Sequence, residues 1–155
     1  SLTHIQGGNF MKLGTIFGSF LIVLCLLSAA HAADIAIIAG DDFPKSSLTS
    51  AEVKDIFLGN MEMIEGTKVF PLDQKDSEEI KKEFMKRIIE MSVIWYNRYW
   101  TKRVFREGGT PPAVKGTQDE VIRGVKEKKG TVGYIWKDEA KGKDGIKILL
   151  TLSGS

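Results

Sequence analysis

Cysteine and histidine are scarce in this sequence, and neither residue type occurs beyond position 31. The one cysteine is Cys25, and the two histidines are His4 and His31. The chain that follows therefore has no disulfide, no Cys or His nucleophile and no zinc site of the usual Cys/His type. It also has no clustered Asp/Asn/Gly loop of the kind that binds calcium. We expect no metal and no cofactor.

Carboxylates remain as candidate catalytic groups after this exclusion. A glycosidase-like hydrolase needs an acid/base pair of carboxylates held at a fixed separation in a cleft. The sequence has 20 Asp and Glu residues, but no pattern singles out such a pair. We expect a protein that is not an enzyme.

Residues 11–32 have the composition of a secretory signal peptide. Met11 and Lys12 are followed by an uncharged apolar run over 13–27 and then by small residues. A basic start, an apolar centre and a small-residue end are typical of a signal peptide, and Ala30 and Ala32 would precede the cleavage site. A retained transmembrane anchor is the alternative, but the run is shorter than the roughly 20 residues that span a membrane.

The predicted boundaries leave one small and nearly neutral domain. We expect an upstream extension without function over residues 1–10, the signal peptide over 11–32 and a periplasmic domain over 33–155. Lys12 is the only charged residue that cleavage removes, so the formal charge falls from +2 to +1. Near neutrality argues against binding driven by bulk charge. We expect no nucleic acid partner, and no membrane contact after cleavage.

Strands and helices are predicted to alternate along this domain. Residues 34–39 are apolar and β-branched and end at Gly40, which is typical of a buried strand. Further strands are predicted at 68–72, 131–136 and 146–150. Pro71 suggests that the second of these is an edge strand or that it ends there.

Capping signals place the predicted helices between these strands. Thr49 with Glu52, Asp76 with Glu79 and Thr117 with Glu120 each predict a helix start. Another helix is predicted from Ser92, and the loop at 108–112 interrupts it. Together these elements predict an α/β domain with a small mixed sheet flanked by helices.

Three segments of the chain resemble the phosphate-binding substrate-binding proteins of ABC transporters. They are LTSAEVKDIFLG at 48–59, GTKVFPL at 66–72 and GTVGYI at 130–135. The resemblance covers residues 34–150 and implies a single lobe of the type II periplasmic binding-protein kind. In the full-length relatives two lobes close on the ligand. The resemblance therefore implies that an ABC permease, a second lobe or a second copy of this chain is a partner.

The resemblance also implies an anion site in the loop after residues 68–72. In the relatives this loop carries an Arg and an Asp-Gly-Ser-Gly-Thr turn, whose hydroxyl and N–H groups hold phosphate at a helix N-terminus. Here Asp76 and Ser77 match the acid and the serine, Lys75 is a neighbouring cation, and the Arg and the Gly-Thr are absent. Carboxylates at Asp76, Glu78 and Glu79 would repel an anion, which favours an ordinary self-capped helix.

Two further serines are candidates for the same site. Ser46 and Ser47 precede the first predicted helix, where a hydroxyl group faces a ligand or simply caps the helix. The candidate ligand-binding residues are therefore Lys75, Asp76, Ser77, Ser46 and Ser47.

Aromatic and cationic residues are interleaved over residues 95–106. Such a pattern suits stacking on single-stranded nucleic acid. On a helix, however, Trp95 and Tyr99 share a face with Met91, which favours core packing with the cations on a solvated face. A dimer interface made by the aromatic residues is a third interpretation.

Two functions remain open. The first is an exported, non-catalytic solute-binding domain with a small oxyanion, phosphate by default, as ligand. The alternative is an envelope interaction module that kept the lobe fold and lost ligand binding.

Overall fold

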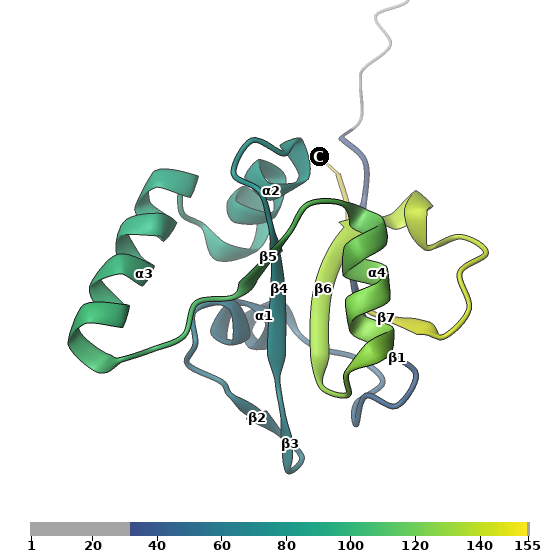
Figure 1. The fold of residues 1–155 in the computed structure, drawn as a ribbon. Coiled ribbons are helices and arrows are strands. Elements are labelled where there is room, and N and C mark those ends of the chain that lie inside the picture. Colours follow the sequence, from purple (N-terminus) through teal and green to yellow (C-terminus); the bar gives the residue numbers. More distant parts are fainter. Residues whose placement is uncertain (1–31, 155) are drawn as a thin grey trace, which may run out of the picture. The chain divides into compact units, whose positions relative to one another are not determined.

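The computed structural model describes residues 32–154, which form a mixed five-stranded sheet with helices on both faces (Figure 1). The predicted upstream extension and all of the predicted signal peptide except Ala32 lie outside the described residues. All strands and both buried clusters lie within residues 35–152. These strands and clusters therefore lie within the predicted periplasmic domain, 33–155.

The elements follow the predicted alternation with additions. The strands are β1 (Ile35–Gly40), β2 (Met63–Ile64), β3 (Thr67–Lys68), β4 (Phe70–Gln74), β5 (Ala113–Lys115), β6 (Thr131–Trp136) and β7 (Ile146–Leu152). The helices are α1 (Ser50–Phe57), α2 (Glu79–Phe84), the π-helical turn η1 (Met85–Ile89), α3 (Val93–Glu107), α4 (Gln118–Glu127) and the 3-10 turn η2 (Lys137–Ala140).

Strand direction decides which loops meet. The sheet order is β5-β4-β6-β1-β7, with β4 parallel to both β5 and β6 and with β1 antiparallel to both β6 and β7. The predicted mixed sheet is thus confirmed. Because of these directions, the carboxyl ends of β4, β5 and β6 point toward the same end of the sheet. The carboxyl end of β1 points toward the opposite end.

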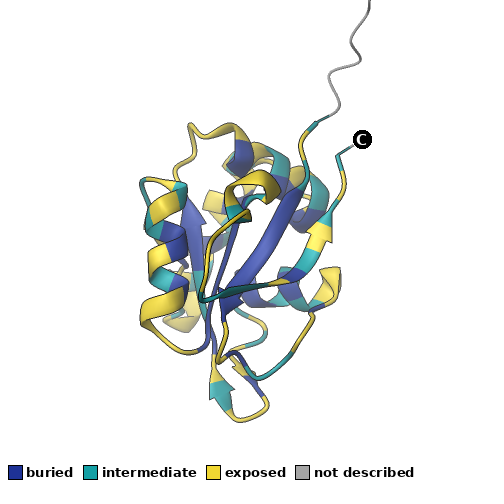
Figure 2. Cartoon of the chain, turned by 90° about the vertical axis from the view of Figure 1, so that its right-hand side faces the viewer, coloured by how far each residue is buried: buried dark blue, intermediate teal, exposed yellow. Residues whose placement is uncertain are grey.

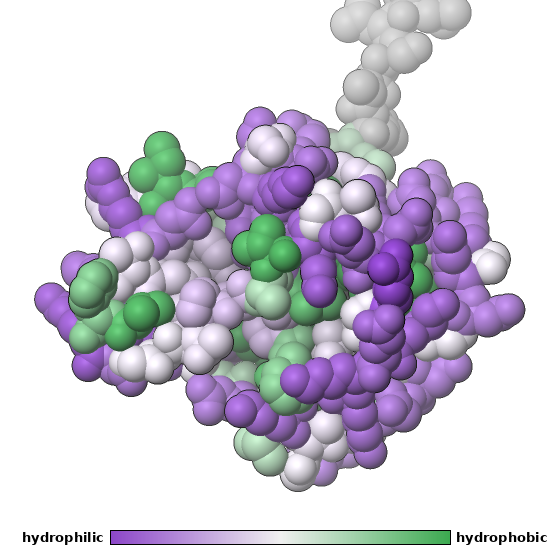
Figure 3. Space-filling model, in the orientation of Figure 1, coloured by the Kyte–Doolittle hydropathy of each residue, from purple (hydrophilic) through white to green (hydrophobic). Residues whose placement is uncertain are grey.

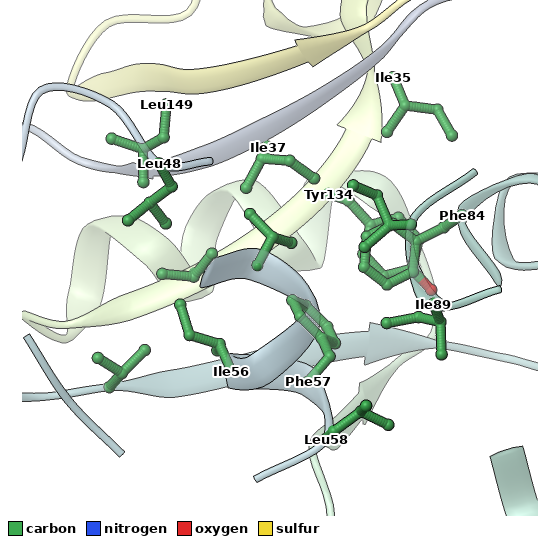
Figure 4. Close-up of a cluster of buried hydrophobic side chains, with 14 of the residues drawn as sticks. Ile35, Ile37, Leu48, Ile56, Phe57, Leu58, Phe84, Ile89, Tyr134 and Leu149 are labelled. Carbon is green, nitrogen blue, oxygen red and sulfur yellow. The ribbon is translucent and has the colours of Figure 1, made fainter. Parts of the chain in front are cut away.

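The sheet is buried between two helical layers. All six residues of β1 are buried (Figure 2), as the uninterrupted apolar run predicts. On one face Ile35, Ile37 and Tyr134 pack against α1, α2 and η1 (Figure 4). On the other face Ala36 and Ile38 pack against α4. Each fully buried isoleucine stabilises the fold by about 1.5–3 kcal/mol.

The capping box predicted for the first helix is confirmed. The Thr49 hydroxyl accepts from Glu52 N at 3.2 Å, and the Glu52 carboxylate accepts from Thr49 N at 2.8 Å. A hydrogen bond from Lys45 and the one from Thr49 lower the pKa of Glu52 below its ordinary value of 4.5. The resulting stabilisation is present above pH 4.5 and is lost as the pH falls through the lowered folded-state pKa.

The other two predicted caps were wrong in part. Thr117 caps α4 by accepting from Glu120 N, but the Glu120 carboxylate accepts from Gly116 N at 2.6 Å instead of closing a box. Helix α2 begins at Glu79, and Asp76 does not cap it. The Asp76 carboxylate accepts instead from Asn97 Nδ2 of α3 at 2.6 Å, so a tertiary contact replaces the local one.

Three short strands were not predicted. Strands β2 and β3 have two residues each and form a hairpin. Its two turn residues, Glu65 and Gly66, both have positive φ. Strand β5 follows Pro111-Pro112 and pairs with β4 from Leu72 onward. Because β4 lies between β5 and β6, it is not an edge strand, and Pro71 precedes the part of β4 that β5 covers.

Two glycines in the GTVGYI segment allow close packing around β6. Gly130 has φ of +86°, and a Cβ there would collide with the carbonyl of Lys68. A Cβ on Gly133 would collide with Cγ1 of Val121 on α4. Glycine at 133 thus lets α4 lie directly on the sheet.

We predict that Gly133→Ala lowers the free energy of unfolding by about 1–3 kcal/mol through overpacking. Urea denaturation of residues 33–155 measures this change. Adding Val121→Ala removes the colliding methyl group, so the double variant is expected to lose less stability than the two single losses combined. Additive losses would show that the Val121 contact is not the cause.

Candidate functional site

A cavity of about 800 Å³ lies at the carboxyl end of β4. The loop at 75–77, helix α3 and strand β5 form its walls. Ligand sites in open α/β sheets lie at this position, just beyond the carboxyl ends of parallel strands. The cavity therefore lies at the carboxyl ends of the parallel strands, where a binding site is expected.

An ion pair forms the buried part of this cavity. Lys81 Nζ donates to Asp73 Oδ2, and the two side chains are 2% and 4% exposed. Asp73 Oδ1 also accepts from the Tyr134 hydroxyl at 2.6 Å and from Gln74 N at 2.8 Å. Because each carboxylate oxygen has a donor, the buried charge of Asp73 is compensated.

Two buried phenols surround this ion pair. Burial, followed by the negative charge of Asp73, raises the pKa of Tyr134 and that of Tyr96 well above the ordinary value of 10.0. Both hydroxyl groups are therefore protonated at neutral pH. Tyr134 acts as a permanent donor to Asp73, and the ring of Tyr134 stacks on Phe84 with centroids 4.0 Å apart.

The Lys81 ammonium group has N–H donors that its hydrogen bond to Asp73 does not use. An ammonium group has three N–H donors. One is bound to Asp73, the Tyr96 ring centroid lies 4.7 Å from Nζ, and the nearest Asp76 oxygen lies 3.8 Å away, beyond hydrogen-bond range. Lys81 thus lines the cavity with a buried cation that still has a donor to offer.

Polar side chains from the 75–77 loop and from α3 surround Lys81. Lys75, Asp76 and Ser77 are exposed and line the cavity together with Asn97 and Thr101. Asp76 is held by its hydrogen bond from Asn97. The structure therefore brings together three of the five predicted site residues. The opposite part of the cavity is apolar, with Val104, Phe105, Pro111, Pro112 and Val114.

The other two predicted residues lie elsewhere. Ser46 and Ser47 are exposed in the loop that follows β1, and neither lines the cavity. Because β1 is antiparallel to β6, this loop leaves the sheet at the edge opposite the carboxyl end of β4. The cap of α1 is Thr49, so neither serine is the N-cap residue.

The sequence analysis did not include Asp73, Lys81, Asn97 or Thr101 among the predicted site residues. One signal was present for Lys81, which lies three residues before Phe84 and seven before Ile88. At helical spacing these positions share the core-facing side. No comparable signal marks Asn97 or Thr101, which reach the cavity through the packing of α3.

Helix α3 is fixed beside the cavity by the end of α1. The last carbonyl groups of a helix have no partner inside the helix. Here Tyr96 Oη and Trp100 Nε1 donate to the Phe57 carbonyl at 3.0 and 3.2 Å. Tyr99 Oη and Arg103 donate to the Leu58 carbonyl at 2.6 and 2.7 Å. These contacts orient the side of α3 that lines the cavity.

A second cavity of about 580 Å³ lies beside Phe70 and the loop at 108–112. Its cationic side chains include Lys68 and Lys128, which lie 5.6 and 3.4 Å from the Phe70 ring centroid. None of the predicted site residues lines it. The first cavity is the better candidate because it combines three predicted residues with a buried cation.

Residues 32–154 contain no group of three or more His, Cys, Asp or Glu placed to hold a metal ion. Among the helices of this same segment, none has the length and apolarity required to cross a bilayer.

Several solved structures share this fold. A phosphate ABC transporter substrate-binding protein from Clostridium perfringens, described with bound phosphate, has a TM-score of 0.60 and 14% identity over 76% of this chain and 45% of its own. PstS from Borrelia burgdorferi has a TM-score of 0.58 and 15% identity over 76% and 47%. An ABC-type phosphate transport receptor from Vibrio cholerae has a TM-score of 0.56 and 13% identity over 76% and 46%.

These structures confirm the fold that the sequence resemblance implied. The chain spans less than half the length of each of them. No protein-family model matches the sequence, and no curated protein matches it. At this level of identity the likeness establishes the fold alone.

We predict that Lys81→Met lowers the free energy of unfolding by about 3–5 kcal/mol, because it leaves the Asp73 carboxylate buried without a counter-charge. Urea denaturation of residues 33–155 at neutral pH measures the loss. The matched control is Lys82→Met, at an exposed position on the same helix, which is expected to change stability by no more than about 0.5 kcal/mol.

A second variant tests whether the charge of Asp73 is the cause. In Asp73→Asn with Lys81→Met, no carboxylate remains at position 73, so part of the lost stability should return. A Lys81→Met loss below about 1 kcal/mol, or no recovery in the double variant, would contradict a buried ion pair.

Proposed function

We propose that this chain is an exported, non-catalytic solute-binding domain whose ligand site is the cavity at the carboxyl end of β4. Phosphate is the first ligand to test, because the chain shares its fold with a phosphate ABC transporter substrate-binding protein described with bound phosphate and with an ABC-type phosphate transport receptor. The predicted signal peptide supports export to the periplasm, where an ABC permease would be the transport partner.

The observation that carries this proposal is the buried ammonium group of Lys81 at the expected edge of the sheet. An anion in the cavity would lie near Lys81, Lys75 and Ser77, all of which line it. Charge-assisted hydrogen bonds of this kind are roughly twice as strong as neutral ones. Lys81 and Lys75 would thus supply the positive charge that the relatives obtain from the missing Arg.

Asp76 provides a basis for selectivity between oxyanions. An ionised carboxylate only accepts hydrogen bonds, and phosphate retains a proton near neutral pH whereas sulfate does not. Asp76, held by Asn97 beside Lys81, would accept a hydrogen bond from the P–OH group of phosphate and repel sulfate. The two carboxylates of the cavity therefore favour a protonated oxyanion.

The charge balance of the cavity favours a second candidate function. Asp73 and Asp76 offset the charges of Lys75 and Lys81, and α2 begins with two more carboxylates at Glu78 and Glu79. A lobe that lost its anion site and now binds another envelope protein would have this arrangement. Such an interaction module is the alternative if the cavity binds no ligand.

We predict that isothermal titration of residues 33–155 with phosphate gives a dissociation constant on the order of micromolar, with weaker binding of sulfate at the same ionic strength. Ser77→Ala should weaken phosphate binding about tenfold, because one hydrogen bond to a charged group is lost. Asp76→Asn should reduce the preference for phosphate over sulfate.

The matched controls for this titration are Ser46→Ala and Ser47→Ala, since both serines lie away from the cavity and both substitutions should leave the affinity unchanged. The absence of heat with either anion, from a sample that unfolds cooperatively, would reject the solute-binding function and favour the interaction module.

A further inference from the structure

The outer side of α3 is not used by the core, and of its residues only Phe105, at its margin, also lines the cavity. Tyr96, Tyr99, Trp100 and Arg103 turn toward the end of α1. Because a helix repeats every 3.6 residues, another set of residues lies on the opposite arc. We call this set the α3 ridge; its members are Ile94, Trp95, Arg98, Lys102, Phe105 and Arg106.

The α3 ridge exposes large apolar side chains. Ile94 is 65% exposed, Trp95 is 62% exposed and Phe105 is 86% exposed. Together with Val104, they make up four of the seven exposed large hydrophobic residues of the described chain. Clustered exposure of this kind on one helix marks an interaction site more often than scattered single residues do.

The ridge also gathers positive charge. Arg98, Lys102 and Arg106 form no ion pair with any residue of the described segment. The Arg98 guanidinium lies 5.0 Å from the Trp95 ring centroid, so cation and aromatic ring share one patch. The near-zero net charge, on which the expectation of no membrane contact was based, conceals this local excess.

The α3 ridge lies on a helix at the periphery of the described domain. Helix α3 lies at the left of the view in Figure 1, with its outer side directed away from the sheet. Figure 3 shows hydrophobic and hydrophilic side chains interspersed over this region. A flat and deformable surface fits a peripheral helix without requiring a groove of matching shape.

We infer that the α3 ridge docks on an anionic phospholipid surface. Trp is favourable at the level of the lipid headgroups, where its ring is buried and its indole N–H is hydrated, and Phe inserts as a purely apolar side chain beside it. Arg and Lys beside them pair with phosphate groups of anionic lipids, and each adds attraction at the membrane surface. The inference is independent of whether the cavity binds phosphate.

A second copy of the chain is a poorer occupant of the same surface. A two-fold symmetric dimer places the same patch of both subunits together. Two α3 ridges in contact would bring Arg98, Lys102 and Arg106 of one subunit near the same set of cations on the other, with no acidic residue on the ridge to offset them. The charges therefore favour a surface of opposite sign.

The inference is tested by co-sedimentation of residues 33–155 with phospholipid vesicles. One set of vesicles contains phosphatidylcholine alone, and the other contains equal parts of phosphatidylcholine and phosphatidylglycerol. We expect sedimentation with the anionic vesicles, little with the neutral ones, and release at high salt, because screening weakens the attraction. The tryptophan fluorescence of bound protein should shift to shorter wavelength as Trp95 leaves water.

Ridge variants and matched controls locate the contact. Phe105→Ser should lower the partition coefficient about tenfold through lost apolar insertion, and the triple variant R98Q/K102Q/R106Q about a hundredfold. The controls are Met63→Ser, an exposed apolar residue on β2, and the triple variant K82Q/K86Q/K129Q, at exposed lysines outside α3. Both controls should reduce binding far less than the ridge variants.

Several results would overturn lipid docking. They are equal binding to neutral and anionic vesicles, absence of binding to either, and equal effects of ridge and control variants. A dimer in analytical ultracentrifugation that Phe105→Ser dissociates would also overturn it, because the ridge would then be an interface between protein chains.

Discussion

The buried carboxylate of Asp73 is the group on which the rest of the site depends. It lies near the end of β4, and its partners come from two other elements, since Lys81 belongs to α2 and the Tyr134 hydroxyl to β6. A charge removed from water requires compensation at every oxygen, so these elements are held in one arrangement. The same compensation places a lysine ammonium group at the floor of the cavity. Stability and the proposed anion site thus share one group.

The end of α1 imposes the second constraint. Its terminal carbonyl groups are satisfied by Tyr96, Tyr99, Trp100 and Arg103, which recur at helical spacing along one side of α3. Once that side is fixed, the neighbouring side of α3 lines the cavity and the far side forms the α3 ridge, with Phe105 at the boundary between the two. One set of hydrogen bonds therefore determines two surfaces. These hydrogen bonds also explain why aromatic and cationic residues are interleaved over residues 95–106, although only one side of this segment packs in the core.

Local signals made much of the fold predictable, and tertiary contacts account for most of the differences. The apolar run of β1 and the Thr49–Glu52 box were sufficient for those elements. Asp76 was expected to cap α2, but Asn97, distant in sequence, binds its carboxylate. The two-residue strands of the hairpin are too short for periodicity to detect, and Pro111-Pro112 obscured β5.

In the site, Lys75, Asp76 and Ser77 were predicted from one continuous loop. Ser46 and Ser47 are separated from them because β1 runs antiparallel to β6, a direction that the sequence pattern does not reveal.

The most direct test of the proposed site is nitrogen-15 NMR of the Lys81 side-chain ammonium group during titration with phosphate. If phosphate binds at the carboxyl end of β4, the Lys81 resonance and the Ser77 amide will shift together and saturate at the same phosphate concentration, and sulfate will have a smaller effect. If phosphate instead shifts exposed lysines such as Lys82 and Lys129 while Lys81 and Ser77 remain unchanged, the cavity built on the Asp73–Lys81 pair is not the ligand site.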